Sequence, residues 1–127
     1  MSTKVPFPFI TEMLFPLHPV IRPMFGAHAI YVREKIMLIM RNKITHPEAN
    51  GIWIATEKEH HESLKKELPV IHSIYMLSDG KSETDWQMIP LEDDNFETYA
   101  TRACELILKS DPRIGRIPKK RKKKLKD

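Results

Sequence analysis

Two short segments in the first half of the chain are apolar at every position, and this pattern constrains the fold most strongly. Residues 36–40 are Ile-Met-Leu-Ile-Met, and residues 52–55 are Ile-Trp-Ile-Ala. Successive side chains of a strand point to opposite faces, so a strand with one wet face alternates apolar with polar residues. Both segments therefore predict strands that are covered on both faces, at the centre of a sheet or beneath a partner.

Start and stop signals predict two helices before the last third of the chain. Residues 10–15 have room for a short helical turn, which Pro16 would end. Thr56 and Glu59 have the spacing of a capping box, in which each side chain satisfies a backbone amide at the start of a helix. Leu64 and Leu68 would share the buried face of that helix, and Pro69 follows as its end.

A last helix is expected to begin at Asp94, with Glu97 in the matching capping-box position, and to end at 110–112. Its buried stripe is predicted to contain Phe96, Ala100, Ala103 and Ile107.

The strands and helices together predict one small α+β fold. Short links between the first strands favour antiparallel pairing, because parallel strands need long crossovers. We expect two layers, with about five antiparallel strands and helices on one face, in the order α-β-β-β-α-β-β-α. A proline-rich arm would occupy 1–19, the domain 20–112 and a basic disordered tail 113–127. The expected strands are 27–32, 36–40, 52–55, 71–77 and 86–90.

The basic character of the chain is confined to its end. The chain of 127 residues carries a net +4, but the last nine residues hold seven bases and one acid, so residues 1–118 carry a net −2. Such a block of like charges repels itself and is expected to be disordered when free. Any contact with nucleic acid is therefore expected from the basic residues Lys119, Lys120, Arg121, Lys122, Lys123, Lys124 and Lys126.

The sequence indicates a cytoplasmic protein. Cys104 has no second cysteine to pair with, and prolines at positions 6 and 8 interrupt the start of the chain, where a secretory signal would need an apolar run. No apolar stretch approaches the ~20 residues that span a bilayer, so no membrane contact is expected.

Two short motifs resemble a known family. Met24-Phe25-Gly26 precedes a strand, a turn and a second apolar strand, and Trp86 precedes Ile89-Pro90, an acidic linker and a closing helix. Over about residues 20–110 this arrangement resembles TfoX N-terminal-like domains and the related YjbR-like proteins. The resemblance implies a two-layer α+β domain with an antiparallel sheet. The family's namesake is a competence regulator, and the resemblance supplies no catalytic residues.

Candidate chemical groups are few. Glu57, His60 and His61 could offer metal ligands from one helix, but a zinc site needs three or four ligands and no paired-ligand motif is present. Cys104 is expected to be a buried core thiol, because free cysteines are among the most buried residues. Arg22, Arg33 and Arg41 are expected to be solvated charges.

These observations predict a non-enzymatic domain without a cofactor, acting through self-association or another protein partner, with regulation as one role. Two alternatives stay open. The first is an accessory protein anchored to nucleic acid by the basic tail, and the weaker second is a metal-dependent enzyme.

Overall fold

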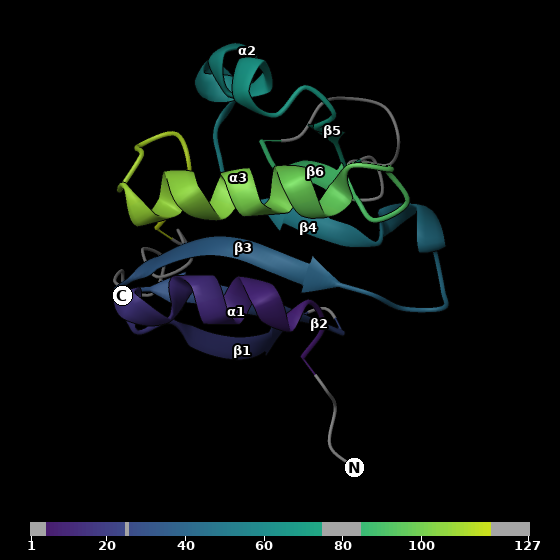
Figure 1. Cartoon of the computed structure of the whole chain (residues 1–127), viewed down its shortest axis with the longest axis horizontal. Helices are drawn as coiled ribbons and strands as arrows, with labels where there is room; N and C mark the ends of the chain where they lie inside the picture. Colours follow the sequence, from purple (N-terminus) through teal and green to yellow (C-terminus); the bar gives the residue numbers. More distant parts are fainter. Residues whose placement is uncertain (1–4, 25, 75–84, 118–127) are drawn as a thin grey trace, which may run out of the picture.

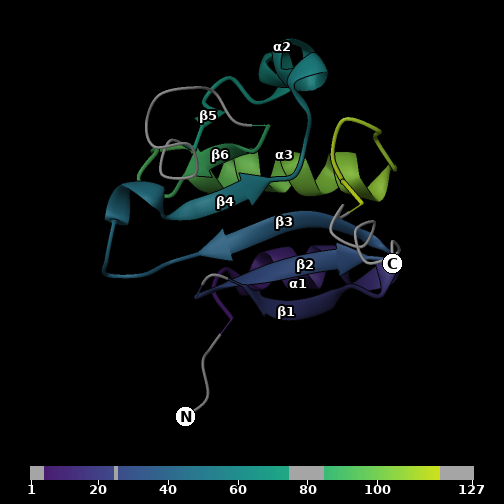
Figure 2. The same ribbon diagram turned by 180° about the vertical axis from the view of Figure 1, so that it is seen from behind.

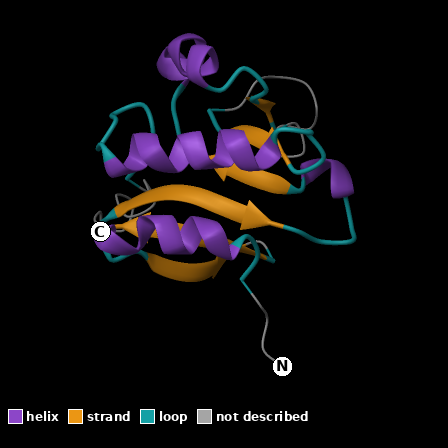
Figure 3. Ribbon diagram, viewed as in Figure 1, coloured by secondary structure: helices purple, strands orange, loops and turns teal. Residues whose placement is uncertain are grey.

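The computed structural model describes residues 5–24, 26–74 and 85–117, and its elements form an antiparallel sheet with helices on one face. The strands lie side by side in the order β1 (Val20–Met24), β2 (Ala27–Val32), β3 (Lys35–Arg41), β4 (Gly51–Ile54), β6 (Gln87–Pro90) and β5 (His72–Ser73). Helices α1 and α3 lie side by side across the sheet in Figures 1 and 2, and α2 lies beyond its β4–β6 side (Figure 3). The predicted α+β class and antiparallel pairing are confirmed.

The described elements follow one another in this order: α1 (Pro8–Leu14), the 3₁₀ turn η1 (Phe15–Leu17), β1 (Val20–Met24), β2 (Ala27–Val32), β3 (Lys35–Arg41), the 3₁₀ turn η2 (Pro47–Ala49), β4 (Gly51–Ile54), α2 (Lys58–Glu67), β5 (His72–Ser73), β6 (Gln87–Pro90) and α3 (Phe96–Leu108).

The two apolar segments form the central strands β3 and β4, as the sequence predicts. Leu38 and Met40 of β3 lie in the main core with α1, α2 and α3. Ile39, between them, lies on the opposite face with Trp53 of β4. All four side chains are almost completely buried, so both faces of the strand pair are covered.

The far face of the sheet has its own, smaller core. Trp53 packs there with Met88 of β6, and its indole nitrogen donates to the carbonyl of Ala49 (2.9 Å). Ala49 belongs to η2, in the connection between β3 and β4, so this connection folds back over the far face.

Burial on α2 and α3 follows the predicted pattern. Leu64 and Leu68 are fully buried. The α3 stripe includes the four predicted residues, the cysteine that the sequence also placed in the core, and Leu106, which the sequence did not single out. The buried α3 residues are Phe96, Ala100, Ala103, Cys104, Leu106 and Ile107.

Both predicted helix caps are wrong. Glu57 and Asn95 occupy the N-cap positions, and neither side chain makes a capping hydrogen bond. The chain continues from β4 into the core at Thr56, whose buried hydroxyl has no hydrogen-bond partner in the part of the chain that the structure describes. The packing of the strand end, rather than local capping chemistry, therefore sets where α2 begins.

Strand boundaries differ from the prediction at both ends of the sheet. Residues 20–24 form an extra edge strand, β1, which tolerates Pro23 because an edge needs hydrogen bonds on one side only. The strand predicted at 71–77 is reduced to β5 within the described residues, and its end lies outside them. The sheet therefore has six strands instead of about five. Gly26, between β1 and β2, has a φ of 77°, which glycine adopts without steric strain.

Both segments that the sequence places outside the domain contribute to the fold. Ile10 and Leu14 of α1 are fully buried in the main core, although they belong to the predicted arm. At the other end, Ile114 is buried and Arg116 exchanges two backbone hydrogen bonds with Ile36. Residues 113–117 are therefore part of the folded body, and 118–127 lie outside the described residues.

In the described part of the chain, no helix has both the length and the apolar character needed to cross a bilayer.

Candidate functional site

The loop at 42–50, which we call the contact loop, is held by two buried polar side chains. Arg41 and Asn50 are only 5% and 7% exposed. The prediction that Arg41 is a solvated charge is wrong, whereas Arg22 and Arg33 are exposed as expected. A buried guanidinium needs several acceptors, and the contact loop supplies them.

The hydrogen bonds of Arg41 and Asn50 link the two sides of the contact loop. Arg41 donates to the carbonyls of Thr45 (2.9 Å) and His46 (2.9 Å) and to Oδ1 of Asn50 (2.8 Å). The Asn50 amide also accepts from the Lys43 amide and donates to the Lys43 carbonyl, both at 2.8 Å. Five hydrogen bonds from two side chains therefore define the path of the loop.

This loop presents one large apolar side chain to solvent. Ile44 is 95% exposed, and it lies between Lys43 and Thr45, whose backbones are held by the network. A loop with a fixed path that exposes an apolar side chain is a candidate for a protein contact. The local sequence gives no sign of this arrangement, because the burial of Arg41 depends on tertiary contacts.

The histidine-rich start of α2 assembles a different group from the predicted one. Glu57, Glu59 and His60 place ligand atoms within 4.8 Å of one another. His61 points elsewhere, and its Nε2 lies 2.9 Å from the Asp85 carbonyl. Within the described ranges no other three residues of the ligating types come together in this way.

One arginine already neutralises part of this cluster. Arg116 lies 3.8 Å from Glu57 and 3.4 Å from Asp85, and His60 lies 3.5 Å from Glu59. The N-terminus of a helix also carries partial positive charge, which disfavours a metal cation. The geometry therefore favours ion pairing at this position over a metal centre.

Cys104 is fully buried in α3. Burial, with a smaller contribution from Glu105, raises the pKa of its thiol to about 12. A thiol with this pKa stays protonated at neutral pH and is a poor nucleophile. The expectation of a core cysteine is confirmed.

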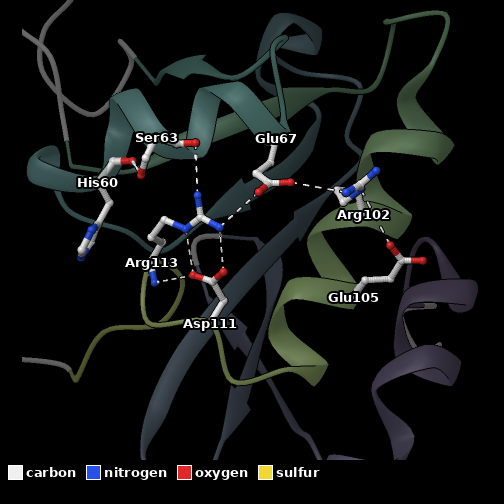
Figure 4. Close-up of polar contacts among 7 residues, drawn as sticks. All are labelled: His60, Ser63, Glu67, Arg102, Glu105, Asp111 and Arg113. Atoms are coloured by element: carbon white, nitrogen blue, oxygen red, sulfur yellow. Dashed lines mark hydrogen bonds and ion pairs between the residues drawn. The ribbon is translucent and has the colours of Figure 1, made fainter.

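An ionic network joins α2, α3 and the C-terminal segment (Figure 4). Arg113 binds both carboxylate oxygens of Asp111, at 2.9 and 2.7 Å, and donates to the Ser63 carbonyl at 3.1 Å. Glu67 lies between two arginines, 3.5 Å from Arg113 and 3.3 Å from Arg102. The network anchors the chain as it leaves α3.

Asp111 is the carboxylate most affected by this network. Hydrogen bonds from Arg113 lower the pKa of Asp111 to about 2, from an ordinary value of 3.8. The same pair raises the pKa of Arg113. The pair therefore stays ionised throughout the neutral range.

The basic tail residues Lys119 to Lys126 lie outside the described residues, so the structure describes no contact for them. No family model, curated protein or solved structure matches this chain.

Replacing Asn50 should loosen the contact loop. Asn50→Ala removes three hydrogen bonds and leaves Arg41 with an unpaired donor, so the free energy of unfolding should fall by about 1–3 kcal/mol. Urea denaturation measures this change. Asn42→Ala is the matched control, because Asn42 is exposed and makes no hydrogen bond within the described part of the chain, and it should change stability by less than ~0.5 kcal/mol. Equal effects of both variants would contradict the assigned role of Asn50.

Stability should depend on the ionisation of Asp111. Because its pKa is about 2 in the folded protein and 3.8 ordinarily, ionised Asp111 stabilises the fold above about pH 4, and this contribution is lost as the pH falls towards 2. Asp111→Asn should remove it, by about 1–3 kcal/mol at neutral pH, and should flatten stability between pH 4 and 2. Thermal melts across that range provide the measurement. Asp94→Asn, at an exposed position without a hydrogen bond among the described residues, should leave the wild-type pH profile intact.

Proposed function

We propose that this chain is a non-enzymatic cytoplasmic domain that acts through protein contacts, with Ile44 of the contact loop as an anchor. The observation that carries the proposal is the combination of a 95% exposed isoleucine with a loop fixed by five hydrogen bonds. A fixed loop loses little conformational entropy when it binds, so an apolar contact there contributes more to affinity.

The other chemical groups give less support to an enzyme. Burial keeps Cys104 protonated, and Arg116 pairs with Glu57 at the start of α2. The unpaired cysteine also supports a reducing compartment. A regulatory role in the cytoplasm is consistent with these features. The partner is either a second copy of the chain or another protein, and the following experiment distinguishes the two.

Site-specific photo-crosslinking tests the contact loop. A photoreactive residue at Thr45, whose side chain is exposed, should form one discrete adduct in cells that contain the native partners, and mass spectrometry should identify it. An adduct of twice the chain mass would identify self-association. Ile44→Asp should abolish the adduct while changing stability by less than ~0.5 kcal/mol, because Ile44 is exposed.

The matched control carries the photoreactive residue at Lys66, an exposed position on α2. It should give no discrete adduct. The proposal fails if Thr45 and Lys66 give the same products, or if the Thr45 adduct persists in the Ile44→Asp variant.

A second candidate function is a nucleic-acid accessory role for the basic tail. The path of residues 115–117 supports it, because Arg116 pairs with Ile36 at the start of β3. The chain therefore approaches its basic block beside Arg33 and Lys35, which are exposed. Together these bases would form a larger cationic surface than the tail alone.

Removal of residues 119–127 tests this second function. Binding of the full chain to RNA or duplex DNA should weaken steeply with salt, and the truncation should weaken it at least about ten-fold by removing seven bases. Fluorescence anisotropy at several salt concentrations measures both effects. The control, Lys65→Met with Lys66→Met, retains the tail and should bind nearly as the wild type does. Unchanged binding after truncation would exclude the tail mechanism.

A further inference from the structure

A cavity of about 440 Å³ opens at the end of the molecule opposite the contact loop. It lies between the β2–β3 hairpin, the end of α3 and the segment that follows α3. The contact loop follows Arg41, the last residue of β3, whereas the cavity is lined by Lys35, the first residue of β3. Its volume is in the ~300–1,000 Å³ range of small-molecule sites.

One part of the cavity wall is apolar. Val32, Ile107 and Ile114 are each 3% exposed, and they form the buried part of the wall. Leu17 and Met37 are partly buried, and Ile117, which is 61% exposed, lies towards solvent. The alkyl group of a ligand therefore has room to extend from solvent, past Ile117, towards the buried residues of the wall.

A β-bulge directs Met37 into this wall. Ile30 pairs with Leu38 and Tyr31 pairs with Ile36, so Met37 is an extra residue without a partner on β2. Neighbouring residues of a regular strand face opposite sides, but the bulge places both Met37 and Leu38 against the helix-side core. Bulges of this kind commonly re-aim a side chain beside a functional site.

Gly115 allows the C-terminal segment to close the same wall. A Cβ atom at this position would lie 2.9 Å from the sulfur of Met37, and the φ of Gly115 is 116°. Any other residue would be strained and would displace Met37. The approach of Gly115 to Met37 therefore shapes the cavity.

The charged groups beside the cavity favour an anion. Arg33 and Lys35 both line it, and neither forms an ion pair within the described ranges. Glu34 contributes one carboxylate to the same hairpin, whereas the carboxylate of Asp111 is already held by Arg113. Among the described residues, the cavity is therefore lined by two cations without an ion-pair partner, Arg33 and Lys35, and by one such carboxylate, Glu34.

The backbone on both sides of the cavity adopts a conformation that non-glycine residues rarely hold. Arg33 has φ 62° and Ser110 has φ 61°, and both residues line the cavity. Arg33 is the first residue of a two-residue hairpin loop, where a positive φ normally favours glycine. Arg33 therefore places its cation at the cavity at a cost in backbone strain.

We propose that this cavity binds an amphipathic anion, a free medium-chain fatty carboxylate, with its alkyl chain along the apolar wall and its carboxylate at Arg33 and Lys35. The chain's own last residues are a poor alternative occupant, because seven of the nine are basic and would be repelled by the same two cations. The inference is independent of the proposed contact loop.

Isothermal titration of the full chain with decanoate, octanoate and hexanoate, below their micelle concentrations, tests the site. Decanoate should bind saturably, with a single molecule per chain, and affinity should fall about four-fold for each methylene removed. Decanol should bind more weakly, and a decyl ammonium cation should not bind saturably. No saturable binding of decanoate would overturn the proposal.

Two charge-matched double variants separate the cavity from general attraction to a basic chain. Arg33→Gly with Lys35→Met should weaken decanoate binding about ten-fold, and glycine suits the backbone at position 33. Lys65→Met with Lys66→Met removes the same charge from exposed sites on α2 and should leave affinity unchanged. Equal losses in both variants would assign binding to the overall charge and overturn the proposal.

Methyl NMR supplies a second measurement that does not depend on the variants. With ¹³C-labelled methionine methyl groups, decanoate should shift the Met37 signal. The Met40 signal should stay unchanged, because Met40 is fully buried near the other end of β3. A shift of Met40 without Met37 would place the ligand elsewhere and overturn the proposal.

Discussion

Burial of β3 on both faces is the constraint from which the remaining architecture follows. Leu38 and Met40 require cover from the helices, and Ile39 requires cover on the far side. Each such side chain contributes roughly 1.5–3 kcal/mol when it is fully buried. A single layer of helices cannot cover both faces, so the loop between β3 and β4 folds back and adds Ala49 to the far face.

The same constraint has different consequences at the two ends of β3. Beyond Met40, Arg41 enters the buried region and binds the carbonyls of the contact loop, which leaves Ile44 outside. At the N-terminal end of β3, the bulge at Met37 interrupts the regular strand pairing. The C-terminal segment is attached there by backbone hydrogen bonds, from Gly115 to Ala55 and between Arg116 and Ile36. The candidate protein contact and the candidate ligand cavity are therefore located at opposite ends of one central strand.

Much of the fold could be predicted from local patterns. The central strands, the α3 stripe and the burial of Leu64 and Leu68 follow from periodicity, which reports how side chains are distributed over the two sides of an element. The capping box at Thr56 was wrong because the strand end continues into the core and buries that residue. The extra strand β1 was missed because Pro23, within it, cannot donate a backbone hydrogen bond to a neighbouring strand, although an edge position tolerates this.

The candidate sites were predicted less well than the fold. The sequence singled out Glu57, His60 and His61, but the turn of α2 groups Glu59 with the first two and directs His61 to Asp85. It gave no sign that Arg41 is buried, because an arginine beside a polar loop is usually solvated. The cavity is formed by residues from four separate parts of the chain, and no local pattern links them.

The sequence by itself determined the α+β class, the central position of two strands and the separation of a basic tail from a slightly acidic body. These properties depend on composition and on the alternation of neighbouring side chains. Only the tertiary structure decided that Arg41 fixes a loop beneath Ile44, that Met37 lies in a bulge and that 113–117 closes a cavity. Each of these depends on groups that are distant in sequence and come together only when the core is buried.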